Sequence, residues 1–147
     1  MNVFDEKNII LAAAPAGKDE AIQMAGQILL DNGYVKPEYL DDMRAREELV
    51  TTYIGNNVAI PHGLHTSGDN ILHSGISFIQ VPNGVEFGDE RESKIAYLVI
   101  GIAGKDGGHM EILSKVALIL TDMDQVERLR TAKSPGEILA VFGAVLN

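Results

Sequence analysis

The sequence has no cysteine and no tryptophan among its 147 residues, and aromatic residues make up only 5% of it. Without cysteine the chain can form no disulfide, no thiolate metal site and no cysteine nucleophile. Hydrophobic residues still account for 46%, so we expect a core built from aliphatic side chains. A chain of this length can bury such a core without a structural metal, which predicts one domain spanning residues 1–147.

Basic residues are also few: 12 lysines and arginines face 21 acidic residues, for a net charge of -9. A negative surface argues against a nucleic-acid partner and is compatible with a basic protein partner. No apolar run approaches ~18 residues, and the first ten residues lack the basic and apolar segments of a signal peptide. We therefore expect no membrane insertion and a cytoplasmic location.

Helical periodicity recurs along the chain, and it is marked by recognisable start and stop signals. Ser134 and Glu137 form a predicted capping box, with Pro135 at the first helical position. After the stretch "GKDGG", an apolar face is predicted from four residues at helical spacing: Met110, Leu113, Ala117 and Leu120. The predicted helices cover residues 19–31, 37–49, 109–122, 124–132 and 134–146.

Strand signals occupy the middle of the chain. "SGISFIQV", the turn "PNG" and the short arm "VEF", residues 74–87, together predict a hairpin. Residues 94–103, "KIAYLVIGIA", are almost uniformly apolar, which predicts a central strand buried on both faces. "VTTYIGNNVAI" indicates a loop followed by a strand, with a break at Gly55. Helices on either side of this strand group predict a sheet covered by helices, of α/β or α+β class.

His62 stands between Pro61 and Gly63 at the end of the short apolar run Val58-Ala59-Ile60. Proline fixes the direction in which the chain leaves the strand, and glycine keeps the approach to the imidazole open. This setting suits a nucleophile or a general base. A solvated loop histidine explains the same local pattern equally well.

The other three histidines differ in their surroundings. His65 and His73 are expected to be ordinary surface or sheet-edge residues. Pro61 and Gly63 disfavour the helix that would align His62 with His65 as metal ligands, so we expect no metal site. His109 begins a helix, where unpaired N–H groups and partial positive charge favour an anion such as phosphate.

Familiar signatures of other enzyme classes are missing. The chain has no G-x-S-x-G elbow, no P-loop and no G-x-G-x-x-G motif, and "GIAGKDGG" imitates the last two only loosely. We expect no nucleotide cofactor.

The segment "EELVTTYIGNNVAIPHG", residues 47–63, resembles the active-site signature of one family: the mannitol/fructose class of EIIA proteins in the bacterial phosphoenolpyruvate-dependent sugar phosphotransferase system. The resemblance continues through "GYVKPEYLDDM", "PNGVEFGDERESKIAYLVIGIAGKDGGH" and the last helices, and therefore covers nearly the whole chain. These longer stretches are most similar to the mannitol-type members. The resemblance implies an α/β fold, a single-domain sandwich whose mixed β-sheet is flanked by helices.

The resemblance also implies a function and three site residues. His62 would accept a phosphoryl group on Nε2 from the phosphohistidine of HPr and pass it to a cysteine of EIIB. Arg46 would stabilise the charge of the phosphoryl group, and His109 would hydrogen-bond its oxygens. Phosphoryl transfer depends mainly on positioning and charge, so we expect no cofactor and no metal. For Nε2 to face the donor, a backbone carbonyl should hold the proton on Nδ1.

The missing cysteine bears on this family's pathway. The EIIB acceptor cysteine must lie on another chain, and the membrane permease EIIC is expected elsewhere too. The resemblance therefore implies a free-standing EIIA, a phosphotransferase component that serves the uptake and phosphorylation of mannitol. Two alternatives stay open: a nitrogen-type regulatory protein whose His62 phosphorylation controls partner binding, and a metal-dependent hydrolase using His62, His65 and His109.

Overall fold

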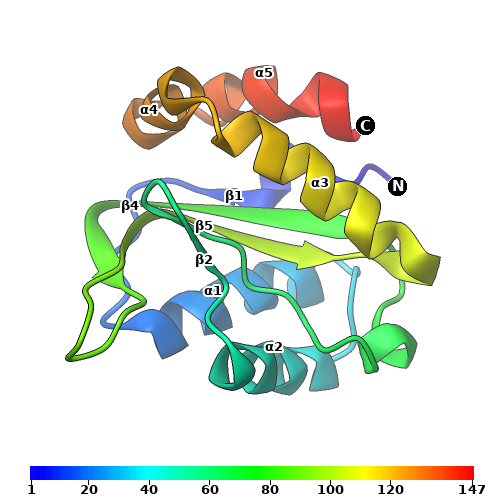
Figure 1. Cartoon of the computed structure of the whole chain (residues 1–147). Coiled ribbons are helices and arrows are strands. Elements are labelled where there is room, and N and C mark those ends of the chain that lie inside the picture. The colour runs from blue at the N-terminus through cyan, green and yellow to red at the C-terminus, as the bar shows by residue number, and fades with distance from the viewer.

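The computed structural model describes all residues, 1–147, and is built on one mixed five-stranded sheet (Figure 1). The strand order is β1-β4-β5-β3-β2. Parallel pairing joins β1 to β4 and β3 to β5, and antiparallel pairing joins β4 to β5 and β2 to β3. The strands are β1 (Ile9–Ile10), β2 (Tyr53–Gly55), β3 (Val58–Ala59), β4 (Gly75–Glu86) and β5 (Ile95–Ala103).

Helices cover both faces of this sheet. In Figure 1, α1 and α2 lie below it, whereas α3, α4 and α5 lie above it. The predicted fold class, an α/β sandwich with a mixed sheet flanked by helices, is confirmed. None of the helices has the length and apolarity needed to cross a bilayer. The helices are α1 (Lys18–Asp31), α2 (Glu38–Leu49), α3 (Gly108–Leu120), α4 (Met123–Thr131) and α5 (Pro135–Leu146), with 3-10 turns η1 (Glu6–Asn8), η2 (Ser67–Asn70) and η3 (Lys105–Gly107).

Strand β5 lies at the centre of the sheet and is buried on both faces, as predicted. Val99 and Ala103 belong to the core shared with α1 and α2, whereas Leu98 and Ile100 belong to the core shared with α3, α4 and α5. Side chains that alternate along a strand point to opposite faces, so an uninterrupted apolar run is what two covered faces require.

The predicted hairpin within residues 74–87 is wrong. Strand β4 runs through the "PNG" stretch, and both of its arms pair with β5: Gln80 opposite Leu98, and Val85 opposite Ala96. The intervening residues form an irregularity in the ladder, with Gly84 at φ 77°. A turn-forming tripeptide can serve a hairpin or a bulge equally well, and only the position of the partner strand decides between them.

The expected loop before the His62 strand is itself partly strand. Tyr53–Gly55 pairs with Val58–Ala59 as a short antiparallel hairpin. Its connection uses positive φ angles at Gly55 (92°), Asn56 (54°) and Asn57 (64°), the conformation that glycine and asparagine adopt most readily. This hairpin delivers the chain to His62.

Most of the core is aliphatic, as expected, but the few aromatic residues also contribute to it. All four phenylalanines and two of the four tyrosines are fully buried and are among the largest side chains in the interior. Each aromatic ring removes a large area from water, so a small number can dominate the packing. The capping box of Ser134 and Glu137 at the start of α5 is confirmed.

Only part of the expected apolar face of α3 points inward: Leu120 is buried and Leu113 packs against the core. Its buried residues are Ile112, Val116 and Leu120, whereas Met110 is 67% exposed. Because α3 is apolar on more than one side, periodicity alone could not select the buried stripe. Met110 lies in the first turn of the helix and borders a cavity.

Candidate active site

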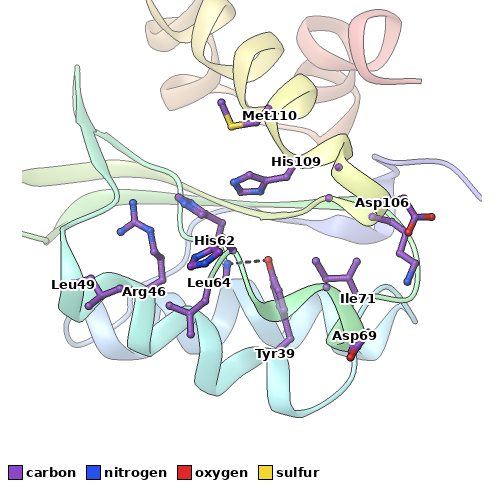
Figure 2. A pocket seen from close by; sticks show the side chains of 16 residues that line it. Tyr39, Arg46, Leu49, His62, Leu64, Asp69, Ile71, Asp106, His109 and Met110 are labelled. Atoms are coloured by element: carbon purple, nitrogen blue, oxygen red, sulfur yellow. Dashed lines mark hydrogen bonds between the residues drawn. The ribbon is translucent and has the colours of Figure 1, made fainter.

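A cavity of about 630 Å³ lies beyond the carboxyl ends of the neighbouring parallel strands β3 and β5. Its walls come from three parts of the chain: α2, the loop after β3, and the turn from β5 into α3 (Figure 2). Open α/β sheets commonly bind their ligands at this end of their strands. The cavity contains all three predicted site residues, Arg46, His62 and His109.

His62 is 8% exposed, and neighbouring backbone groups hold both its main chain and its ring. The N–H of Ile102 donates to the carbonyl of Pro61 at 2.9 Å, which extends the β3–β5 pairing as far as His62. The Nδ1 atom of His62 lies 2.8 Å from the carbonyl oxygen of Ile60. A carbonyl can only accept, so Nδ1 carries the proton and Nε2 is the free nitrogen. The predicted backbone carbonyl is confirmed.

Tyr39 holds the loop that contains His62 and Gly63 in place. It was not predicted as a site residue from the sequence. Its hydroxyl donates to the carbonyl of Ile102 at 2.7 Å and accepts from the N–H of Gly63 at 2.9 Å, the dashed line in Figure 2. A Cβ at Gly63 would lie 2.5 Å from Cε1 of Tyr39, so only glycine permits this approach. Burial raises the pKa of Tyr39 to about 12, which keeps the phenol protonated as a donor. Its spacing of seven residues from Arg46, two helical turns, is the signal that could have found it.

His109 comes from the first turn of α3 and faces His62, with ring centroids 4.9 Å apart and an interplanar angle of 53°. The turn that brings it there passes through positive φ at Asp106 (52°) and Gly107 (83°). Gly104 makes the approach possible, because a Cβ there would lie 2.2 Å from the Cα of His109. The half-buried ring therefore closes the cavity opposite His62 (Figure 2).

Arg46 lies in the last turn of α2 and is partly exposed. Its guanidinium donates to the carbonyl of Val50 at 2.5 Å, which restrains the side chain beside the cavity. A guanidinium has five donors, so this contact leaves others for an anion. Arg46 therefore brings a permanent positive charge to the cavity.

Both facing imidazoles are biased towards the neutral form. Burial is the largest cause lowering the pKa of His62, and the charges of His109 and Arg46 lower it further; the Ile60 carbonyl and Glu47 act in the opposite direction. The pKa of His109 is lowered by burial and then by Arg46. A neutral His62 with its proton held on Nδ1 has a nucleophilic lone pair on Nε2.

His65 and His73 are exposed, as expected, although His65 also borders the cavity. Lys105 and Asp106 line the same cavity and had not been assigned any role from the sequence. The structure contains no group of three or more histidine, aspartate or glutamate side chains placed to hold a metal ion.

The arrangement suits a nucleophile that receives an anionic group. A free Nε2 faces a space bordered by a second imidazole and a guanidinium, and these groups can donate to the oxygens of a phosphoryl dianion. In-line phosphoryl transfer needs little more than such positioning and charge.

Comparisons with known proteins agree with this geometry. The family model "Phosphoenolpyruvate-dependent sugar phosphotransferase system, EIIA 2" matches residues 2–144. The mannitol-specific phosphotransferase enzyme IIA component of Bacillus subtilis (strain 168) is 46% identical over 145 residues, covering 99% of each chain. The component of the same name from Geobacillus stearothermophilus is 47% identical, covering 99% of this chain and 98% of its own.

A solved structure extends the likeness to three dimensions. It is a complex of enzyme IIAMTL and phosphorylated enzyme IIBMTL from Escherichia coli, which superimposes with a TM-score of 0.89 at 39% identity and covers 96% of this chain and 97% of its own. The family match spans nearly every residue, including both sides of the cavity. The chain belongs to the EIIA 2 family of the phosphoenolpyruvate-dependent sugar phosphotransferase system.

Proposed function

We propose that this protein is a phosphocarrier that accepts a phosphoryl group on Nε2 of His62 from phospho-HPr and passes it to the cysteine of a separate EIIB. One observation carries the proposal: the contact of 2.8 Å between Nδ1 of His62 and the Ile60 carbonyl, which leaves Nε2 as the nucleophile. The cavity beside the ring supplies room for the group and for the donor's own imidazole.

Arg46 and His109 have complementary roles in this proposal. Arg46 supplies permanent positive charge for the phosphoryl oxygens, and His109 supplies a directional hydrogen bond from a ring centred 4.9 Å from that of His62. The charge that builds up on the equatorial oxygens is therefore met from two directions. The step requires no metal and no cofactor.

The names of the relatives support mannitol as the sugar whose uptake and phosphorylation the pathway serves. Two relatives that match 99% of this chain at 46–47% identity are named mannitol-specific, which favours this role over the nitrogen-type regulatory alternative. The complex of the related Escherichia coli protein with phosphorylated IIBMTL supports an EIIB partner. A cytoplasmic location follows from the same role, because HPr would meet the protein there.

Phosphorylation by the general components of the pathway tests the site. Incubation with phosphoenolpyruvate, enzyme I and HPr should place one acid-labile phosphate on His62, located by mass spectrometry of proteolytic fragments. His62→Gln should accept none. His65→Gln, an exposed histidine at the border of the same cavity, is the matched control and should be phosphorylated at the normal rate. Normal labelling of His62→Gln would refute the assignment.

A second assay separates the mannitol role from the regulatory alternative. The phosphorylated protein is mixed with a mannitol EIIB, and transfer to the EIIB cysteine is followed by loss of the acid-labile label. Transfer is expected. A protein that is phosphorylated on His62 but does not pass the group to this EIIB would fit the regulatory role instead.

A further inference from the structure

Glu47 is the only acidic side chain buried in the molecule, at 5% exposure. One of its oxygens, Oε1, accepts hydrogen bonds from the N–H of Thr52 at 2.9 Å and from its hydroxyl at 2.5 Å. The other oxygen, Oε2, is buried and has no hydrogen-bond partner. Burying a carboxylate oxygen without a hydrogen-bond partner costs free energy. An interaction elsewhere in the molecule is therefore needed to explain why Glu47 lies here.

A short chain of hydrogen bonds connects this carboxylate to the His62 ring. Glu47 holds Thr52, the carbonyl of Thr52 accepts from the N–H of Ile60 at 3.0 Å, and the carbonyl of Ile60 lies 2.8 Å from Nδ1 of His62. Thr52 precedes β2 and Ile60 follows β3, so the middle bond continues the pairing of these two strands. The orientation of the carbonyl that holds the imidazole thus depends on a residue in the last turn of α2.

The charge of Glu47 also reaches the ring. Burial is the largest influence on the pKa of His62 and lowers it, and His109 and Arg46 lower it further, whereas the Ile60 carbonyl and Glu47 raise it. Lys105, Asp106, His65 and Asp69 line the same cavity as the ring. Glu47 does not line the cavity, yet it is the only acidic side chain among the groups that shift the pKa of His62.

The sign of this effect matters for phosphoryl transfer. The lone pair of Nε2 forms the new N–P bond as the N–P bond of the donor histidine breaks, and the donor ring leaves with that electron pair. The proton on Nδ1 stays in place, so the His62 ring changes from neutral to formally cationic. A buried carboxylate whose charge acts on the ring stabilises this form, because Coulomb interactions are weakly screened in the interior.

We propose that Glu47 is a positioning residue for phosphoryl transfer, which orients the Ile60 carbonyl through Thr52 and stabilises the cationic ring of phosphorylated His62. This deepens the proposed function and rests on it. Glu47 touches neither the phosphoryl group nor the donor, and it acts only through the ring.

The variant Glu47→Gln separates charge from connectivity. The amide retains an oxygen that can accept from both donors of Thr52, whereas the charge is lost. The neighbouring Glu48→Gln removes the same charge from an exposed position and is the matched control. We expect a lower pKa for His62 in Glu47→Gln, measured by NMR titration of the unphosphorylated protein, and roughly tenfold slower acceptance of phosphate from HPr. Glu48→Gln should match the wild type in both measurements.

The outcomes are decisive in each direction. An unchanged pKa of His62 in Glu47→Gln, or a normal transfer rate with a lowered pKa, would overturn the proposal. If Glu47→Gln does not fold, Thr52→Val replaces it: this change removes one of the two bonds to Oε1, and a normal transfer rate would again overturn the proposal. The NMR titration needs no phosphoryl donor, so a wild-type protein that fails to become phosphorylated would refute the proposed function while the titration still tests the coupling of Glu47 to His62.

Discussion

Replacing Tyr39 with phenylalanine isolates the hydroxyl that fixes the His62 loop. The ring keeps its packing against Gly63, and only the oxygen is lost. That oxygen serves two buried backbone groups, the N–H of Gly63 at 2.9 Å and the carbonyl of Ile102 at 2.7 Å. The variant therefore leaves two interior polar groups without their partner.

The magnitude follows from these two groups. Each buried group left unpaired costs about 1–3 kcal/mol, and phenylalanine recovers a part because it has no hydroxyl to desolvate. We expect the free energy of unfolding to fall by about 2–4 kcal/mol, measured by urea denaturation with an unchanged m-value. The Gly63 amide should also exchange its hydrogen faster than in the wild type.

Tyr53→Phe provides the control. Its hydroxyl accepts a single bond, from the N–H of Asn57 at 3.2 Å, at a half-buried position. The expected loss is below about 1 kcal/mol. If Tyr39→Phe were no more destabilising than this control, or if the Gly63 amide kept its protection, the view of Tyr39 as a clamp on the loop would be refuted.

Further outcomes concern charge at the site. His109→Ala and Arg46→Ala should each slow phosphoryl acceptance about 10- to 100-fold, because each variant loses one charge-assisted hydrogen bond of ~1.5–3 kcal/mol. The circular dichroism spectrum should not change. Normal transfer rates in both variants would contradict the roles of these residues. The protein should become less stable on acidification. The pKa of His62 and of His109 in the folded state lies below the value of ~6.5 that holds in the unfolded chain. The unfolded chain therefore binds more protons below about pH 6.5, and the free energy of unfolding decreases as the pH falls below this value. Urea denaturation between about pH 7.5 and pH 5.5 measures the drop, which should be smaller in His62→Gln; an equal drop would count against a buried neutral imidazole.

The helices and the central strand were accessible from sequence because their signals are local. Periodicity predicted all five helices, and an uninterrupted apolar run identified β5. Turn chemistry was less informative. Residues 82–84 contain a good turn sequence, yet they bulge within β4, because the strand on either side pairs with the same neighbour. A pattern within one strand contains no record of its partner.

The residues of the candidate site also differ in how clearly the sequence marks them. Pro61 and Gly63 draw attention to His62 in the sequence itself, and the start of a helix draws attention to His109. The signals for Tyr39 and Glu47 are weaker: Tyr39 is only two helical turns from Arg46 in the sequence, and Glu47 is only the first residue of the segment 47–63. Their importance comes from bonds to Gly63 and Thr52, and these bonds exist only once α2 has packed beside the strands.

By itself, the sequence determined the chemistry that this protein can offer: no cysteine, one histidine set between proline and glycine at a strand end, and an apolar strand that must be covered on both faces. The tertiary structure decided which groups meet. The rings of His62 and His109, 47 positions apart in the chain, lie 4.9 Å apart because β3 and β5 are parallel neighbours whose carboxyl ends reach the same edge of the sheet. It also decided which nitrogen of His62 is free, since the ring's orientation depends on a backbone carbonyl fixed by strand pairing.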